Sequence, residues 1–405
     1  MSFLEKSSWL KRNVLHLIIL VSGTLAILAY FRYTQLTLNY QEAPLFDGNQ
    51  YLKVYQNFRS ETKKTVSFPY NTRILVPFLA LEISNFLGFT ALKSFEYLNY
   101  IFTILSVLSL FILWKNLKIK DPLIAVGFFW LLFHWTGILR LNQFDPITVD
   151  VPLYFFQTLL LILLWSKRYV WIIPTSMIST AQKESMIGLL AILFALELWR
   201  FWKHRSNRDT VIFLFLSIIF SVLTKAYLDY NYPPAEEGKF FHTTILLRAM
   251  QVLLDPFLLI RWITAIFVAF GAFIITSLCL KIKDFRFTEF EQQIGVLSIT
   301  YFLFGLFAGG DILRIVFLGF PFIMTFCLLQ LKNASEKVWL LVIFSSFPLL
   351  RVRKSIPSPT KNWTGFTEWY PEYASQTTVL FYFAYGVVIV ALAYFFLFRS
   401  KSSKT

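Results

Sequence analysis

Long apolar runs recur along the whole chain and are separated by short polar segments. Most have the length that an α-helix needs to cross the hydrocarbon core of a bilayer, about 17–25 residues. The first run, residues 14–31, is longer than the apolar core of a signal peptide and has no small-residue cleavage site, so we expect a helix there. The pattern predicts about twelve transmembrane helices. Their expected ranges are 13–32, 98–114, 123–139, 151–165, 169–181, 186–202, 210–227, 256–280, 294–307, 315–331, 338–350 and 379–398.

Short basic clusters follow alternate apolar runs, which predicts the side of the membrane on which each loop lies. Cytoplasmic loops are rich in Lys and Arg, so both termini are expected in the cytoplasm, with external loops at 33–97, 229–255 and 351–378. The run Arg351-Val-Arg353-Lys354 is the exception, because this count leaves it outside. A further apolar piece, residues 74–89, contains Pro77 and Glu82 and is expected to be a re-entrant or surface-lying helix.

Composition agrees with a membrane protein and argues against other classes. Apolar residues make up 57% of the chain and charged residues only 15%, too few charges for a soluble domain of 405 residues. The net charge of +15 does not indicate nucleic-acid binding, because the cations sit between apolar runs, where they fix topology. The fold class expected is therefore an all-α polytopic membrane protein, forming a single domain over residues 1–405.

Two acids precede apolar or amphipathic helices at the predicted outer face. Asp47 begins a stretch in which Tyr51 and Tyr55 recur at helical spacing, and Asp150 begins the helix at 151–165. A carboxylate at such a place can act as a general base or bind a divalent metal. Taken alone, each acid is more often an N-cap that accepts backbone N–H groups.

Three further groups of charges lie between apolar runs, where unpaired charges are costly and often functional. Lys183 and Glu184 are adjacent and could form a pair within a turn. Asp311 and Arg314 follow Gly309-Gly310, and they could hold a phosphate or close the turn on each other. Arg73, before the re-entrant segment, has the same two interpretations. No His/Cys cluster with metal-ligand spacing, phosphate-binding glycine loop or Ser-centred elbow occurs in the sequence.

The order of these pieces resembles a known family. Asp47-Gly-Asn-Gln-Tyr51 lies in the first outer loop, followed by Tyr70-Asn-Thr-Arg73-Ile-Leu-Val-Pro77, Val149-Asp150-Val-Pro-Leu-Tyr-Phe-Phe and Thr180-Ala-Gln-Lys183-Glu184. Over roughly residues 1–200 this order is similar to the GT-C superfamily of integral-membrane glycosyltransferases. It looks most like the branch of protein O-mannosyltransferases and lipid A aminoarabinose transferases. Many relatives have an acidic pair in the first loop, whereas Gly48 follows Asp47 here, which puts metal dependence in doubt.

The resemblance implies a GT-C-like fold with juxtamembrane helices in the first external loop. It implies transfer of a sugar from a polyprenyl-phosphate donor to a glycan, lipid or protein acceptor. Asp47 would activate the acceptor; Tyr51, Asp311 and Glu184 would contribute to substrate binding. Asp150 would place the sugar or, with Asp47, a divalent metal, the one cofactor implied. The phosphate would be bound by residues Arg73, Lys183 and Arg314.

Other functions fit the same pattern of helices. About twelve helices with both ends inside is also the plan of many transporters, so a flippase of lipid-linked sugars is one alternative. A polysaccharide polymerase or ligase and a non-catalytic subunit of a membrane complex are the others. Residue usage favours a bacterial cytoplasmic membrane, with the site facing the periplasm or exterior, in contact with membrane lipids and with no nucleic acid.

Overall fold

The structure, a computed structural model, describes residues 3–44, 46–60, 64–204, 207–235, 241–283 and 286–398. Within these ranges every regular element is helical. The α-helices are α1 (Phe3–Thr34), α2 (Gly48–Arg59), α3 (Leu75–Leu87), α4 (Ala91–Asn116), α5 (Asp121–Phe133), α6 (Arg140–Phe144), α7 (Val151–Trp165), α8 (Ile172–Gln182), α9 (Ser185–Trp202), α10 (Arg208–Asn231), α11 (Phe241–Leu254), α12 (Phe257–Lys283), α13 (Glu289–Phe307), α14 (Ile312–Leu318), α15 (Phe320–Leu331), α16 (Glu336–Ser346), α17 (Trp363–Thr367) and α18 (Gln376–Phe398). Three short 3₁₀ helices are η1 (Tyr70–Thr72), η2 (Tyr169–Trp171) and η3 (Phe347–Leu350).

Seven of the described helices are long and apolar enough to cross a membrane: α1, α4, α9, α10, α12, α13 and α18. The pair α14 and α15 gives an eighth span if its 63° bend is counted as a break within one crossing. The predicted all-helical, polytopic membrane protein is therefore confirmed, but the structure supports seven or eight spans and not twelve. The helices at the other predicted crossings are too short: α7, the longest, has 15 residues, about 23 Å at 1.5 Å per residue against a core of about 30 Å.

The segment expected to be re-entrant or surface-lying forms α3, which has only 13 residues. Pro77 stands in its first turn, where the missing N–H leaves no helical hydrogen bond unmade. The helix ends at Gly88, whose φ of 68° is in the left-handed region that glycine adopts without strain. Glu82 is exposed on its surface. The structure thus shows a short helix at this segment, and its re-entrant or surface-lying position stays a prediction.

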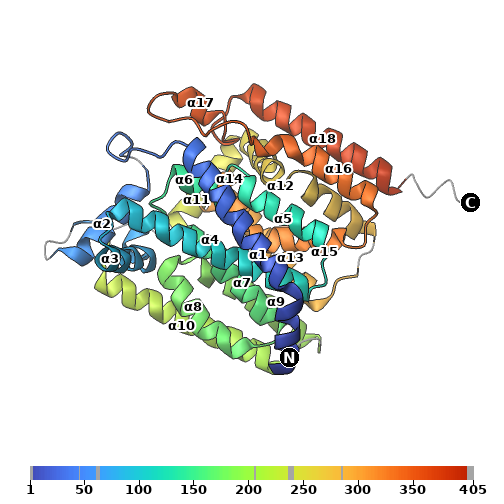
Figure 1. The fold of residues 1–405 in the computed structure, drawn as a ribbon, viewed down its shortest axis with the longest axis horizontal. Helices are drawn as coiled ribbons and strands as arrows, with labels where there is room; N and C mark the ends of the chain where they lie inside the picture. Colours follow the sequence, from blue (N-terminus) through green and yellow to red (C-terminus); the bar gives the residue numbers. More distant parts are fainter. Residues whose placement is uncertain are drawn as a thin grey trace, which may run out of the picture.

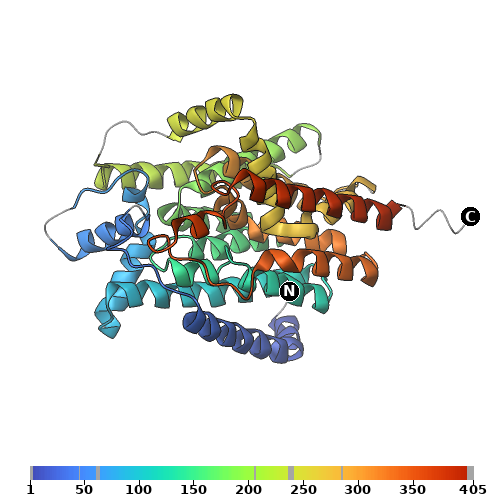
Figure 2. The same cartoon turned by 90° about the horizontal axis from the view of Figure 1, so that it is seen from above.

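The centre of the bundle consists of α4, α7, α12, α13 and α15. The side chains of α15 are almost all buried, and those of α7 are mostly so. Helices α1, α10 and α18 lie at the periphery with most of their apolar side chains exposed, as expected for surfaces that face lipid (Figures 1 and 2). The membrane-spanning helices have apolar side chains on all faces, because both the neighbouring helices and the lipid accept apolar side chains.

Helix α12 is broken at Gly271, where φ is 53°. A Cβ at this position would lie 2.6 Å from Ser346 Oγ of α16, so only glycine allows the close crossing. The backbone groups freed by the break are bonded: Ala272 N–H donates to Ser346 Oγ at 2.9 Å, and Trp130 Nε1 donates to the Ala269 carbonyl at 2.8 Å. Because these backbone groups are hydrogen-bonded to side chains, the irregular backbone at Gly271 can lie within the membrane.

Most of the predicted external segments gather at one end of the bundle, which we call the loop-rich end. It carries α2, α3, α6 and α17, while α1 begins and α18 ends toward the opposite end (Figures 1 and 2). Segment 351–378 contains turns and α17, as a loop should. The predicted external segment at 229–255 contains the 14-residue helix α11; residues 236–240 within it lie outside the described part of the chain.

Candidate functional site

All eight predicted site residues lie in one polar network at the loop-rich end. They come from segments that are far apart in the sequence but end at the same level of the bundle. Asp47 precedes α2, which carries Tyr51; Arg73 follows η1; Asp150 precedes α7; Lys183 and Glu184 join α8 to α9; Asp311 precedes α14, which carries Arg314.

Arg314 is the centre of this network. Its Nε and Nη2 each lie 2.7 Å from Asp150 Oδ2. Its Nη1 points toward two other carboxylates, 3.7 Å from Asp47 Oδ2 and 3.6 Å from Asp311 Oδ2. One guanidinium therefore balances three acids, and its planar fork suits this arrangement better than a point charge would.

Asp150 is buried and paired with two cations. Lys183 Nζ donates to Asp150 Oδ1 at 2.7 Å, so both carboxylate oxygens are occupied, one by Lys183 and one by Arg314. Burial alone would raise the pKa of Asp150, but the charges of Arg314 and Lys183 outweigh it and hold the pKa well below its ordinary value. Burial has the larger effect on Lys183, whose pKa is lowered despite the charge of Asp150. Asp150 is thus fixed as an anion that organises its neighbours.

Arg73 binds Glu184, the acid that follows Lys183 in the sequence. Its Nε and Nη2 donate to the two carboxylate oxygens of Glu184 at 3.0 and 2.5 Å. Its Nη1 donates to Tyr51 Oη at 3.1 Å. Burial would raise the pKa of Glu184, yet the bidentate guanidinium lowers it to about 2. Lys183 and Glu184 therefore do not pair with each other, and each reaches a different segment.

Asp47 is partly accessible to solvent, with 32% of its side chain exposed. Of the other acids that Arg314 contacts, Asp311 is 44% exposed and Asp150 only 6%. Its Oδ1 accepts a hydrogen bond of 2.6 Å from Tyr70 Oη. Neither Asp47 nor Asp150 caps its helix, because neither side chain bonds to a backbone N–H of the first turn. The interpretation of these acids as N-caps is thus wrong, and Asp47 keeps an open face toward solvent.

A second acid–tyrosine pair lies beside Asp47 and was not predicted as part of the site. Tyr40 Oη donates to Asp145 Oδ1 at 2.5 Å and accepts from Ile147 N–H at 2.8 Å. A Cβ on Gly48 would lie 2.3 Å from the Tyr40 ring, so glycine after Asp47 is needed for this approach. Burial raises the pKa of Asp145 to about 6, although Arg314 and the Tyr40 bond oppose the shift. The position of Asp145 in an outer loop was the available signal, but nothing in its spacing distinguished it.

The loop after α17 brings two more side chains to the network. Tyr373 Oη donates to Asp311 Oδ1 at 3.0 Å, and Glu372 Oε1 accepts from Leu313 N–H at 3.2 Å. Glu372 Oε2 is buried without a hydrogen-bond partner among the described residues. Burial, together with the charge of Asp311, raises the pKa of Glu372 to about 8. The sequence showed only an aromatic outer loop here and gave no sign that an acid would be buried.

The donor set does not fit a divalent metal at Asp47 and Asp150. Both oxygens of Asp150 already face fixed cations, and Arg314 stands between the two carboxylates. Within the described ranges no group of three or more His, Cys, Asp or Glu side chains has metal-site geometry. A metal would have to enter against the charges of Lys183 and Arg314, so no step is assigned to one below.

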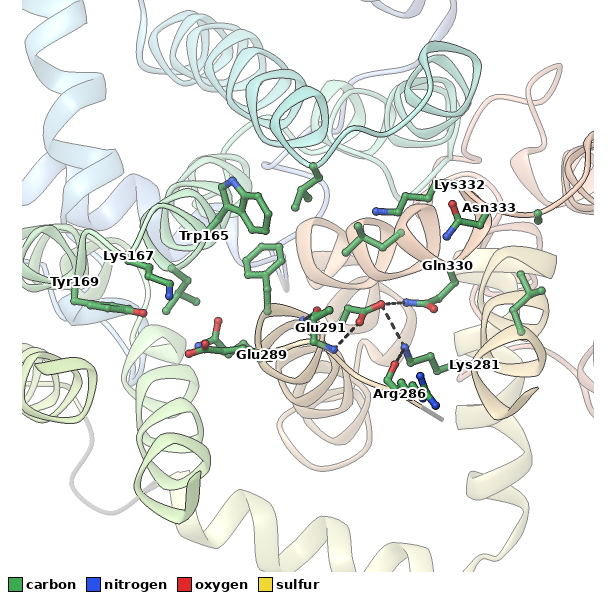
Figure 3. A pocket seen from close by; sticks show the side chains of 18 residues that line it. Trp165, Lys167, Tyr169, Lys281, Arg286, Glu289, Glu291, Gln330, Lys332 and Asn333 are labelled. Atoms are coloured by element: carbon green, nitrogen blue, oxygen red, sulfur yellow. Dashed lines mark hydrogen bonds and ion pairs between the residues drawn. The ribbon is translucent and has the colours of Figure 1, made fainter. Parts of the chain in front are cut away.

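A pocket with a volume of about 860 Å³ lies at the opposite end of the bundle (Figure 3). It is surrounded by the ends of α7, α12 and α15 and the start of α13. On one side Lys281 Nζ lies 3.4 Å from Glu291 Oε1, which also accepts from Gln330 Nε2 at 2.9 Å. Lys167 and Lys332 line it from facing sides (Figure 3). None of the predicted site residues lines this pocket.

Comparison of the chain with protein-family models, with curated proteins and with solved structures gives no match. The functional interpretation therefore depends on the geometry of the site and on the motif order in the sequence.

Proposed function

We propose that this protein is a membrane glycosyltransferase of GT-C type that uses a polyprenyl-phosphate-linked sugar. The observation that carries the proposal is the convergence of Asp47, Asp150, Lys183 and Arg314 at the loop-rich end. Sugar transfer needs a base for the acceptor and cations for the departing phosphate. This network offers both, with the base partly open to solvent and the cations beside it.

In the proposed reaction, an acceptor O–H attacks the anomeric carbon of the donor sugar. A new C–O bond forms, the bond from that carbon to the phosphate oxygen breaks, and the polyprenyl phosphate leaves with the electron pair. Asp47 takes the acceptor proton. Arg314 Nη1, which is the guanidinium nitrogen not bonded to Asp150, stabilises the phosphate. Lys183 and Arg73 add positive charge on the side of α8 and α9, and Asp150 holds Lys183 and Arg314 in place.

The same proposal fixes an orientation in the membrane. The loop-rich end faces the exterior or periplasm, and the basic ends of α4, α9, α12 and α15 face the cytoplasm. The donor's isoprenoid chain lies in the bilayer beside the apolar helices. A bacterial cytoplasmic membrane suits this arrangement.

Transfer by the purified protein in lipid nanodiscs tests the proposal. Radiolabelled undecaprenyl-phosphate sugars are offered with a lipid and glycan extract as acceptor, and wild type is compared with Asp47→Asn. We expect label to move to an acceptor with wild type and transfer to fall by about 10²–10⁴-fold in the variant, while gel filtration shows intact protein. EDTA should leave transfer unchanged, because the site does not fit a metal. Absence of transfer with every donor sugar contradicts the proposal.

The pocket in Figure 3 favours a second candidate, a flippase of lipid-linked sugars. Helix α7 begins at the polar network and ends at that pocket, and between them Gln157 of α7 is hydrogen-bonded to Tyr301 of α13. Polar groups at both ends of one helix are expected of a transport path. A flippase would move labelled lipid across a vesicle membrane with no acceptor present, whereas a transferase, including a polysaccharide polymerase or ligase, would need one.

A further inference from the structure

The one basic run that the positive-inside rule leaves outside has a specific place in the fold. Arg351, Arg353 and Lys354 line a pocket of about 580 Å³ at the loop-rich end, together with Trp369 and Tyr382. The pocket lies between η3 at the end of α16, the loop before α18 and the start of α18. We call it the basic outer pocket. Because cations disfavour the external side during insertion, their presence here requires a reason.

Arg140, a fourth cation, shapes this pocket from inside. Its guanidinium is buried, and Nη1 donates to the Leu350 carbonyl at 2.7 Å, while Nη2 donates to the carbonyls of Arg351 and Lys354 at 3.2 and 2.5 Å. Arg140 therefore fixes the backbone of residues 350–354 through hydrogen bonds to its carbonyl groups. Burial, with the nearby charge of Arg351, lowers the pKa of Arg140 to about 10.

Arg351 is held among aromatic rings. Its guanidinium carbon lies 4.8 Å from the Trp369 ring centre, 5.5 Å from that of Tyr382 and 5.6 Å from that of Trp135. Stacking on ring faces leaves the edge of the guanidinium, with its N–H donors, available for an anion. Its Nη2 also donates to Tyr382 Oη at 2.5 Å.

The positive charge of this pocket is not balanced by ion pairs. Among the residues that the structure describes, no carboxylate forms a salt bridge with Arg140, Arg351, Arg353 or Lys354. Glu368 lines the pocket but accepts a hydrogen bond from Ser375 N–H at 3.0 Å. Three cations, Arg351, Arg353 and Lys354, line the pocket with one acid, Glu368, which makes it a site for an anion.

The apolar surroundings indicate that this anion belongs to a lipid. The side chains of Phe344, Phe347 and Phe381 on α16, η3 and the start of α18 are 72%, 51% and 69% exposed. In the proposed orientation these three side chains lie on the side of the acyl chains, below the pocket. We propose that the basic outer pocket binds the phosphate of an anionic phospholipid headgroup. This headgroup lies at the external surface of the membrane that the protein spans, with the acyl chains against α16 and α18.

Such a lipid would also stabilise the loop that completes the candidate site. Trp369, which stacks on Arg351, is followed by Tyr370, whose ring centre lies 6.3 Å from that of Tyr373, and Tyr373 bonds to Asp311. Fixing Arg351 therefore fixes the segment that brings Glu372 and Tyr373 to the network. The lipid binding is independent of the proposed glycosyltransferase activity; only its effect on turnover depends on that activity.

Lipid binding to the detergent-purified full chain tests the proposal. The probe is fluorescent phosphatidylglycerol, with phosphatidylcholine as the neutral lipid and free glycerol phosphate as a soluble competitor. Arg353→Gln/Lys354→Gln is the main variant, because both side chains are exposed. Lys361→Gln, an exposed lysine of the same outer segment, is the matched control. We expect saturable phosphatidylglycerol binding that weakens about ten-fold or more in the double variant and stays unchanged in the control.

Three results would overturn the proposal. Equal weakening in the control would mean general surface charge and no site. Equal binding of phosphatidylcholine, whose phosphate is neutralised by its own choline, would mean that the pocket does not select a headgroup with net negative charge. Competition by glycerol phosphate at the concentration of the lipid would identify a soluble anion as the ligand. Because none of these readouts uses sugar transfer, a failure here is distinguishable from a failure of the proposed function.

Discussion

The two ends of the bundle both contain buried ion pairs, but they are built differently. At the loop-rich end Arg314 joins acids at positions 47, 150 and 311, and Arg73 joins Glu184, so all of these pairs except Arg314–Asp311 link distant segments. At the opposite end Arg200 pairs with Glu197 one turn away and with Glu289 of the packed helix α13, and Lys281 pairs with Glu291 across a short connection. Pairs of the second kind fix neighbouring helices together. Those of the first kind bring several charges to one point, which is what a reaction centre requires.

Accessibility varies within each end. At the loop-rich end Asp47 is about one-third exposed and Asp150 is buried, while at the other end Glu197 is fully buried and Glu289 is 36% exposed. A buried ion pair is weak evidence for net stabilisation, but breaking one leaves an uncompensated charge. Substitution should therefore separate the two ends: loss of activity at the loop-rich end, and loss of stability alone at the other.

Replacing Arg314 should have the largest effect. In Arg314→Gln three carboxylates lose their shared cation and the proposed phosphate contact is removed, so we expect transfer to fall by at least about 100-fold. Arg314→Lys keeps the charge but loses the planar fork, and should recover only part of the activity. Transfer in nanodiscs, normalised to folded protein by gel filtration, measures both. Activity of Arg314→Gln close to wild type would show that the network is structural.

The sequence predicted which residues belong to the network around Arg314, but it did not predict which of them contact each other. Order along the chain identified Asp47, Arg73, Asp150, Lys183 and Arg314, because charges between apolar runs are rare and stand out. It could not show that Lys183 reaches Asp150 while Glu184 reaches Arg73, since those pairings depend on how α8 and α9 pack. For adjacent residues, pairing with each other was the simpler expectation, and tertiary contacts replaced it.

The fold shows the same limit: the hydrophobic pattern of the sequence predicts where helices form, but it does not predict how they pack. Apolar runs located almost every helix, but they overstated the number of spans, because a run such as residues 151–165 is apolar through burial in the bundle centre. Hydropathy does not distinguish a helix surrounded by other helices from one surrounded by lipid. Asp145 and Glu372 were missed for a related reason: their burial arises from loops that close over them, and no periodic signal marks such loops.

Arg200→Gln is the matched test at the opposite end. It leaves Glu197 buried without its guanidinium partner, although Gln293 Nε2 still donates to Glu197 at 2.9 Å. We expect a loss of about 3–5 kcal/mol, seen as a lower apparent Tm in a fluorescence-detected melting assay. Transfer per folded molecule should stay within about two-fold of wild type, because the proposed reaction centre is at the other end. A specific loss of transfer without loss of Tm would contradict this separation of the two ends.

Asp145→Asn should produce a smaller effect, which depends on pH. The folded protein holds the Asp145 proton more tightly than the unfolded chain does, with a pKa of about 6 against an ordinary 3.8. Native Asp145 therefore lowers stability as pH rises from about 4 to 6, and the full cost, at most about 3 kcal/mol, is present above pH 6. Asparagine can still accept the Tyr40 hydrogen bond but cannot ionise. The variant should melt a few degrees higher than wild type at pH 7.5 and almost equally at pH 4; a lower Tm at pH 7.5 would mean that attraction to Arg314 outweighs the cost of burying the charge.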